Sequence, residues 1–256
     1  MSDKVVEIKD LRVRFGGLTV LEGVSLDVEQ GDVVGIVGPN GGGKTTLLNA
    51  LLGNVPITSG SVKLFGQDLN EFRDFQKIGY VAQNAIQFDP IFPATVREIV
   101  ALGCVRKSNL GRLLKDSDWE DVQSAIDLVD LTKLAERKIS ELSGGQKQRI
   151  FIARALVRKP RLLILDEAAA GLDICIQDQF VKILRNLRSQ EDMTILTVSH
   201  DLSGVMCQAN KLAVVNRKVY VTDINSSTDP TPILREAYGH HFTFIFHHDQ
   251  STCEGE

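Results

Sequence analysis

A glycine-rich stretch that ends in a lysine and a threonine is the first place where this sequence could do chemistry. Residues 38–45 read Gly38, Pro39, Asn40, Gly41, Gly42, Gly43, Lys44 and Thr45. Glycines let successive backbone N–H groups point at phosphate oxygens, at the positive end of a helix dipole. The Lys44 ammonium group can reach the β- and γ-phosphates of a nucleotide, and the Thr45 hydroxyl can coordinate Mg²⁺. We therefore predict a nucleotide-phosphate site, with Thr46 as a further contact to the α-phosphate.

The elements around this loop are the ones that such a site requires. An apolar run at residues 33–37 reads as a strand, and leucines at helical spacing across residues 45–52 read as a helix. Short strand-like runs also stand before the loop at residues 5–8 and 24–28. The alternative is a glycine-rich turn that only closes a strand–helix unit. The strand, the helix and the Lys-Thr pair together favour the phosphate site.

Two adjacent carboxylates follow a second apolar run. Residues 162–165 are Leu-Leu-Ile-Leu, and Asp166 and Glu167 come next. Strands that alternate with helices form parallel sheets, which bind ligands beyond the carboxyl ends of their strands. We expect Asp166 to bind the metal ion, directly or through water, and Glu167 to accept a proton from an attacking water. The alternative is a strand that simply ends in solvated acids.

Two more polar side chains stand at the ends of predicted strands. His200 follows the run at residues 194–198, and Gln83 follows the run at residues 78–82. An isolated histidine is more often a surface or core residue, but this position predicts a contact with the γ-phosphate. Gln83 by itself is unremarkable.

A second glycine-bearing segment opens a predicted helix with the residues Ser143, Gly144, Gly145 and Gln146. Ser143 and Gln146 fit the S-x-x-Q capping box, so a plain helix N-cap is one interpretation. Two glycines in a first turn cost about 1 kcal/mol each relative to alanine, which makes sense where bare N–H groups must approach an anion. The chain already has one phosphate loop, so we expect this helix end to serve a nucleotide held by another copy.

Taken together, the motifs resemble the ATP-binding subunit of an ABC transporter, with every landmark in order between about residues 5 and 222. The resemblance implies an α/β fold with a P-loop (RecA-like) core, an antiparallel β subdomain and an inserted helical subdomain. The ATP-binding domain is then residues 4–222, with the helical subdomain at about 88–158. Residues 223–256 remain as a C-terminal His-rich tail.

The same resemblance implies a head-to-tail homodimer in which ATP lies between the loop of one subunit and residues 143–146 of the other. It places Phe15 against adenine, Gln83 near Mg²⁺ and the membrane partner, and Asp173 against the opposing subunit. The implied catalytic residues are Lys44, Glu167 and His200, and the implied Mg²⁺ ligands are Thr45, Gln83 and Asp166.

Ala168 stands where the family usually has proline after the catalytic glutamate. Without that ring the backbone is less restricted, so we expect residues 168–173 to be more mobile, with no catalytic group lost.

Histidines gather near the end of the chain at His240, His241, His247 and His248. Histidine suits Zn²⁺, but in an extended segment His241 and His247 lie roughly 20 Å apart. One tetrahedral site therefore needs the tail to fold back, or ligands from a second chain. A solvated tail is the simpler interpretation.

Composition limits the remaining choices. The 256 residues carry 29 Lys and Arg against 33 Asp and Glu, a net charge of −4, which argues against a nucleic-acid partner. The apolar runs are of strand length, so transport requires a separate membrane permease. Residues 89–103 resemble the zinc/manganese/iron importer subfamily, which implies an extracytoplasmic metal-binding protein and a place at the cytoplasmic face of the membrane. We expect this segment to border the groove that accepts a permease helix, with Phe88, Ile91 and Phe92 as exposed apolar contacts; ordinary packing of a helical subdomain is the other interpretation. An importer of another substrate, or a non-transport ABC ATPase, is the alternative.

Overall fold

The computed structural model describes residues 4–83, 85, 93–106, 109–168, 181–187, 193–225 and 227–238. The chain divides into two compact units. The first unit joins Met1–Arg73 to Thr194–Glu256, and the second is Asp74–Met193. Within the described residues, none of the helices combines the length and the apolar character that crossing a membrane requires.

The first unit contains a parallel group of strands that ends where the glycine-rich loop begins. β3 (Val33–Val37) lies between β8 (Thr194–Val198) and β9 (Lys211–Asn216) and runs parallel to both. β10 (Lys218–Asp223) pairs with β9 in the antiparallel direction. All five residues of β3 are buried, as expected for a strand covered on both faces. This burial explains the unbroken apolar run at residues 33–37.

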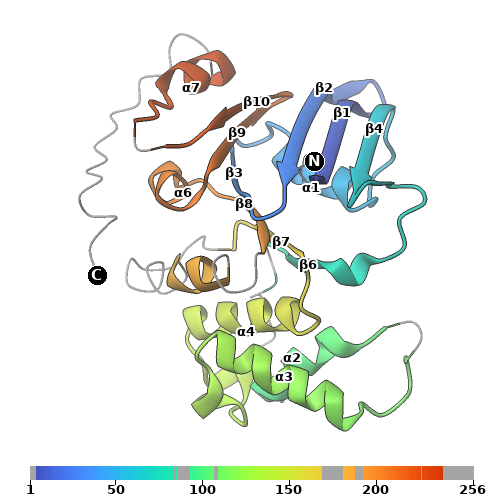
Figure 1. Ribbon diagram of the computed structural model, residues 1–256, viewed down its shortest axis with the longest axis vertical. Coiled ribbons are helices and arrows are strands. Elements are labelled where there is room, and N and C mark those ends of the chain that lie inside the picture. Colours follow the sequence, from blue (N-terminus) through green and yellow to red (C-terminus); the bar gives the residue numbers. More distant parts are fainter. Residues whose placement is uncertain are drawn as a thin grey trace. The chain divides into compact units, whose positions relative to one another are not determined.

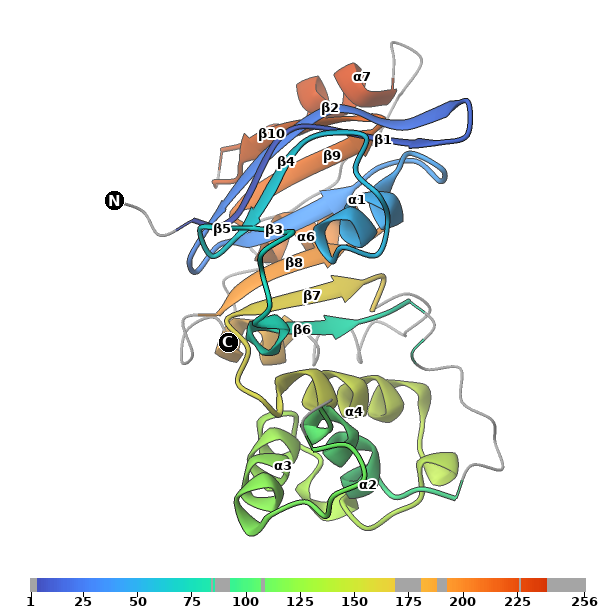
Figure 2. The ribbon, with the colours of Figure 1, turned by 90° about the vertical axis from the view of Figure 1, so that its right-hand side faces the viewer.

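An antiparallel sheet forms the other layer of the first unit. Its order is β2-β1-β4-β5, with bounds β1 (Lys4–Phe15), β2 (Leu18–Glu29), β4 (Ser59–Leu64) and β5 (Gln67–Asp68). Exposed and buried residues alternate along much of β1 and β2, so one face of the hairpin packs inward. Figure 2 shows this hairpin in blue, extending to the tight turn at residues 16 and 17.

Three helices complete the first unit: α1 (Lys44–Leu51), α6 (Leu202–Gln208) and α7 (Thr231–Tyr238). α1 follows the glycine-rich loop directly, and α6 follows β8. α7 packs against β9 and β10 (Figure 1) through Leu234 and Ala237, which are both buried.

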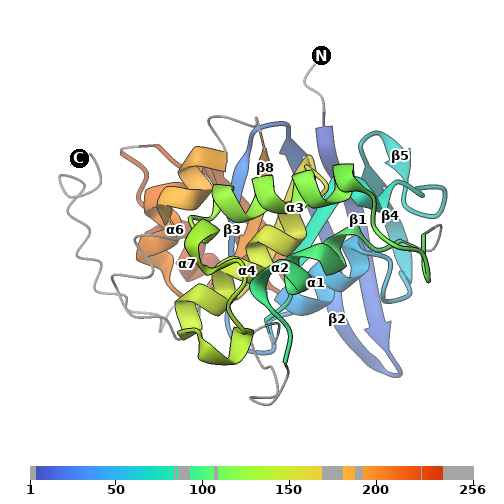
Figure 3. The same ribbon diagram turned by 90° about the horizontal axis from the view of Figure 1, so that it is seen from below.

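The second unit combines two parallel strands with a helical bundle. β6 (Ile78–Val81) pairs with β7 (Leu162–Asp166). Residues 181–187 are helical. The bundle itself consists of α2 (Val96–Ala101), α3 (Asp116–Leu128) and α4 (Gly144–Leu156), with short 3₁₀ turns at Phe75–Lys77, Leu102–Cys104, Thr132–Leu134 and Ile139–Glu141. The three helices pack on one another, as Figure 3 shows from below. Arg158 connects them further, because its guanidinium group donates to the Asp118 carboxylate and to the Cys104 carbonyl, each at 2.8 Å.

The structure agrees with the expected α/β class and adds elements that the sequence does not predict. The first two strands are 12 residues each, whereas the sequence predicts only short runs at residues 5–8 and 24–28. Four shifts of register along this hairpin interrupt the apolar alternation that would reveal its length. α7 lies in the stretch that the sequence predicts as a polar tail.

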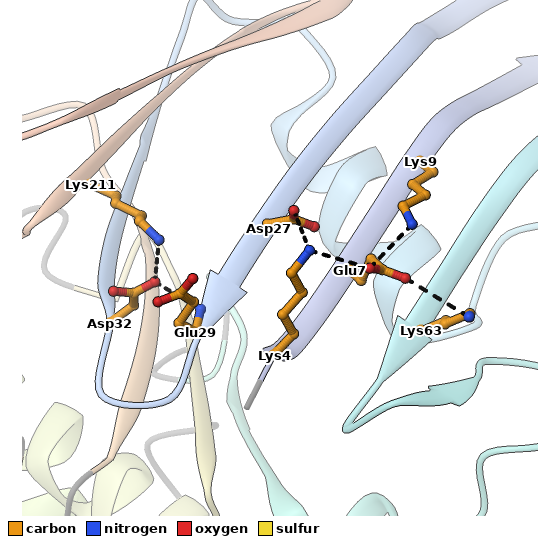
Figure 4. Close-up of polar contacts among 8 residues, drawn as sticks. All are labelled: Lys4, Glu7, Lys9, Asp27, Glu29, Asp32, Lys63 and Lys211. Atoms are coloured by element: carbon orange, nitrogen blue, oxygen red, sulfur yellow. Dashed lines mark hydrogen bonds and ion pairs between the residues drawn. The ribbon is translucent and has the colours of Figure 1, made fainter. Parts of the chain in front are cut away.

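A buried carboxylate fixes the start of β3 in the first unit. Asp32 accepts hydrogen bonds from Lys211 at 2.6 Å and from the Glu29 N–H at 2.8 Å (Figure 4). It also accepts a hydrogen bond from Asn210 at 2.8 Å. Burial alone raises the pKa of Asp32, but these hydrogen bonds outweigh it, so the pKa lies below its ordinary value. One side chain therefore holds the end of β2 and the starts of β3 and β9 together.

Replacing this carboxylate should weaken the fold. We expect Asp32→Ala to lower the free energy of unfolding at pH 7 by about 2 kcal/mol, because Lys211 is left without its buried partner. The folded pKa is below the unfolded value, so the contribution is present above about pH 4 and is lost as the pH falls through the folded pKa. Urea unfolding at a series of pH values measures both effects, and the gap between the two proteins should narrow in acid.

Asp27→Ala is the matched control, since Lys4 donates to Asp27 at 2.7 Å while 47% of the Asp27 side chain is exposed. An exposed pair of this kind contributes at most about 1 kcal/mol. Equal losses in the two variants at pH 7 would contradict the role given to Asp32.

Candidate functional site

The glycine-rich loop of the first unit lies so close to the neighbouring chain that side chains are excluded. A Cβ at position 38 would lie 2.0 Å from the carbonyl oxygen of Val215 in β9. At position 43, where φ is +105°, a Cβ would lie 2.7 Å from the Leu21 side chain of β2. The loop is thus held between β9 and β2, with its backbone rather than side chains on the inside. This is the geometry that leaves N–H groups available to an anion.

Lys44 folds back over this loop. Its ammonium group donates to the carbonyl oxygens of Gly38 at 2.8 Å and of Pro39 at 3.1 Å, and the side chain is buried. The amine therefore lies inside the curl of the loop, at the N-terminus of α1, where a phosphate would be bound. A phosphate entering the loop meets this cation directly.

A hairpin turn supports the outside of the loop, and no pattern in the sequence predicts this contact. The Arg217 N–H, between β9 and β10, donates to the Gly42 carbonyl at 2.9 Å. The Arg217 carbonyl in turn accepts from the Glu22 N–H at 2.7 Å. Arg217 has φ +58°, a left-handed conformation that orients both groups. Because these contacts are between backbone atoms, no residue type could have indicated them.

His200 lies at the same sheet edge as the loop. Ile36 of β3 is opposite Val198 of β8, and the Ser199 N–H donates to the Ile36 carbonyl at 3.1 Å. The chain therefore leaves β8 at the level where β3 turns into the loop. His200 is exposed there, as its proposed contact with a bound phosphate requires.

The other predicted residues of the first unit are accessible to a ligand. Phe15 ends β1 with 46% of its surface exposed, an unusual position for a large aromatic residue. Thr45 is exposed and Thr46 half-buried in the first turn of α1, and Asn40 is exposed in the loop.

The second unit brings Gln83 and Glu167 together. Val81 of β6 is the partner of Leu165 in β7, so the residues two positions later leave the strands side by side. The Gln83 side-chain amide donates a hydrogen bond to the Glu167 carboxylate. Glu167 has φ +51°, a conformation that is uncommon for residues other than glycine and that clusters at functional sites.

Asp166 lies at the buried end of β7, with 2% of its surface exposed. The Tyr80 hydroxyl donates to Asp166 at 3.4 Å. Burial and the Asp166 charge together raise the pKa of Tyr80. Tyr80 was not predicted as a site residue, and its position on β6, two residues before the predicted end of that strand, is the only signal that could have indicated it.

The N-terminus of α4 has the geometry of a helix cap with an open backbone. The Gln146 N–H donates to the Ser143 hydroxyl at 3.3 Å, and the Ser143 N–H donates to the Gln146 side chain at 3.0 Å. These bonds form the predicted capping box. Ser143 and Gly144 are exposed, and a Cβ at Gly144 would meet no atom within 4 Å. The cap and an accessible anion site are compatible in this arrangement.

Some predicted residues lie outside the described part of the chain. They are Asp173, four histidines of the tail and the expected permease contacts, namely His240, His241, His247, His248, Phe88, Ile91 and Phe92. Ala168 is buried, and the rest of the turn that follows it is outside the described residues. In the described part, no group of three or more His, Cys, Asp or Glu side chains could hold a metal ion.

The donors predicted for Mg²⁺ have suitable chemistry. Thr45, Gln83 and Asp166 offer hydroxyl, amide and carboxylate oxygens, the hard ligands that this ion takes. Asp166 and Gln83 belong to the second unit and Thr45 to the first.

A P-loop, two strand-end acids and a second glycine-bearing helix start define a nucleotide-binding protein of the ABC class. The ABC transporter family model matches residues 21–170. The chain therefore belongs to the ABC transporter family, as its ATP-binding and ATP-hydrolysing subunit.

Curated relatives cover nearly the whole chain. The zinc uptake system ATP-binding protein ZurA of Listeria monocytogenes is 41% identical over 216 residues, covering 84% of each chain. The zinc import ATP-binding protein ZnuC of Hydrogenovibrio crunogenus is 33% identical and covers 98% of this chain and 96% of its own. The manganese transport system ATP-binding protein MntB of Bacillus subtilis is 32% identical, covering 98% of each.

Solved structures show the same fold. The cbiO1 protein of Clostridium perfringens, part of the ABC transporter complex cbiONQ, superposes with a TM-score of 0.77 at 26% identity, covering 91% of this chain and 92% of its own. The ADP conformation of MJ1267, an ATP-binding cassette of an ABC transporter, also gives a TM-score of 0.77 at 27% identity, covering 86% and 91%.

The close approach of the loop to β9 predicts a steric effect on nucleotide binding. In Gly38→Ala the new methyl group meets the Val215 carbonyl, so the loop must move away from β9. We expect the Kd for ATP to rise more than about tenfold, because the N–H groups no longer converge. Titration with a fluorescent ATP analogue measures this. Gly17→Ala is the control, since a Cβ at that position meets nothing within 4 Å; equal affinities in the two variants would contradict the steric account.

Proposed function

We propose that this chain is the ATPase subunit of an importer that takes up a divalent metal ion, with zinc or manganese as the substrate. The observation that supports this most is that one ATPase chain carries every polar group that the reaction requires. The metal substrate is supported by the zinc and manganese transport proteins that it resembles over most of its length.

ATP binding in this proposal begins at the loop of residues 38–45. Its N–H groups and the α1 dipole hold the β- and γ-phosphates, and Lys44 moves its hydrogen bonds from the loop carbonyls to the phosphate oxygens. Thr46 adds a contact to the α-phosphate. The exposed ring of Phe15 stacks on the adenine.

Hydrolysis uses the strand-end residues. Glu167 accepts the proton of the water that attacks the γ-phosphate, and its hydrogen bond with Gln83 orients the carboxylate. His200 donates a hydrogen bond to a γ-phosphate oxygen, where negative charge develops in the transition state. Thr45, Gln83 and Asp166 would hold Mg²⁺, which when bound neutralises charge on the β- and γ-phosphates.

The second glycine-bearing helix start completes the site of another subunit. We propose a head-to-tail homodimer in which Ser143, Gly144, Gly145 and Gln146 of one subunit contact the γ-phosphate held by the other. The open backbone at Gly144 supports this role, because a phosphate can approach the first N–H groups of α4 without meeting a side chain. Asp173 is proposed to contact the opposing subunit.

The family supports the partners that we propose. We propose that the dimer binds integral-membrane permease subunits at the cytoplasmic face of the membrane. An extracytoplasmic metal-binding protein delivers the ion to the permease. The net charge of −4 supports a protein partner rather than nucleic acid.

Replacing the proposed base should separate binding from hydrolysis. Glu167→Gln keeps the shape of the side chain and an oxygen that accepts hydrogen bonds, but the neutral amide cannot take the proton from water. We expect kcat to fall at least about 100-fold while the Kd for ATP stays within about twofold. Phosphate release and nucleotide titration measure the two quantities. Turnover at the wild-type rate would remove Glu167 from its assigned role.

The same variant tests the transport function in cells that lack this chain. We expect the wild-type chain to restore uptake of radiolabelled zinc or manganese and Glu167→Gln to restore none. If the wild-type chain restores uptake of none of the three metals zinc, manganese and iron, an importer of another substrate is favoured. Copurification with nucleic acid or ribosomes instead of a membrane protein would favour a non-transport ATPase.

A further inference from the structure

α7 lies outside the ABC motifs, and those motifs do not explain where it packs. Two of its side chains line a cavity of about 60 Å³ whose other walls carry site residues. Leu234 and Tyr238 come from α7, Gly38 from the phosphate loop, and Ser199 and His200 from the end of β8. A helix from the C-terminal part of the chain thus stands directly behind the two segments that are to hold the γ-phosphate.

The cavity is too small to be a nucleotide or substrate site. A space of this size holds on the order of two water molecules, far below the 300 Å³ or more of a ligand pocket. What matters about this cavity is therefore which residues form its walls.

α7 is attached to the sheet at the point where the sheet supports the loop. The Asn216 side chain, at the end of β9, donates to the Ala237 carbonyl at 2.7 Å. The residues on either side of Asn216 are the ones that contact the loop: the Val215 carbonyl lies against Gly38, and the Arg217 N–H binds Gly42. A shift of α7 would therefore displace the loop as well as His200.

Buried and half-buried side chains attach α7 to the first unit. Leu234 is 3% exposed, and Tyr238 is half-buried at the end of the helix. Burial raises the pKa of Tyr238, so its ring presents a neutral surface to the cavity at physiological pH.

We propose that Leu234 and Tyr238 are positioning residues for ATP hydrolysis, which hold His200 and the start of the phosphate loop in place from behind. This inference rests on the role proposed above for His200. The bound phosphates are held mainly by N–H groups and Lys44, so loss of this support affects the transition state more than ATP binding.

The test is a comparison of kcat with KM for ATP in the purified full-length protein. We expect Tyr238→Ala and Leu234→Ala each to lower kcat about tenfold, with KM changed by less than about twofold. Tyr238→Phe keeps the ring and should keep most of the wild-type kcat.

Leu64→Ala is the control for a loss of packing alone. Leu64 is also fully buried in the first unit, on β4, away from the cavity. We expect it to lower the unfolding midpoint about as much as Leu234→Ala and to leave kcat unchanged.

Three results would overturn the inference. Wild-type kcat in both Tyr238→Ala and Leu234→Ala, with His200→Ala inactive, means that α7 does not position the histidine. An equal fall of kcat in Leu64→Ala means that stability alone is responsible. Wild-type turnover in His200→Ala would remove the role proposed for His200 and, with it, this inference. The first result, by contrast, leaves the role of His200 intact.

Discussion

The contact between position 38 and the carbonyl of Val215 is the constraint on which the nucleotide site depends. Only a residue without a side chain allows the loop to pass this close to β9, since a Cβ would lie 2.0 Å from that oxygen. The loop is fixed on its other side by β2 and by the hydrogen bond from Arg217. Its N–H groups are therefore oriented before any ligand arrives, and an anion bound there requires little rearrangement of the protein.

The support for this loop extends further along the chain than its motif. β3 carries it, Asp32 fixes the start of β3, and the hairpin of β9 and β10 lies against it. α7 is bound to that hairpin through Asn216. Residues far apart in the sequence thus converge on one turn of backbone, and its position depends on the packing of the whole first unit.

The sequence predicts candidate site residues because their chemistry is carried by side chains at the ends of strands. The loop, Asp166, Glu167 and His200 each follow an apolar run, whereas Gln83 is indicated only by the resemblance to the ABC family. Their pairing within each unit, such as the hydrogen bond between Gln83 and Glu167, follows from the parallel register.

Two kinds of feature could not be predicted from the sequence. The first is contacts between backbone atoms, and the second is elements whose apolar pattern is too short or too interrupted to be recognised. The bond from Arg217 to Gly42 joins backbone atoms, so its presence does not depend on the Arg217 side chain. α7 has only two buried residues, Leu234 and Ala237, which is too few for a helical pattern to be recognised in a polar stretch. The long hairpin of β1 and β2 was hidden because its register shifts break the alternation of apolar residues.

The two glycine-bearing helix starts give the account its central claim. α1 begins beside Lys44 in the first unit, and α4 begins beside Ser143 in the second, each with a backbone open to an anion. We propose that the γ-phosphate of one ATP contacts one helix start of each kind. We interpret them as complementary halves that two copies of the chain exchange in a head-to-tail dimer, so that every complete site contains parts of both.

Mixing two inactive variants tests this claim most directly. Lys44→Ala lacks the first half of the site and Ser143→Ala the second, and each should hydrolyse ATP at a small fraction of the wild-type rate. In an equal mixture, half of the dimers combine the two variants and contain one intact site of two, which predicts recovery of about a quarter of the wild-type activity. A mixture that stays as inactive as its components would show that each chain completes its own site, and would contradict the account.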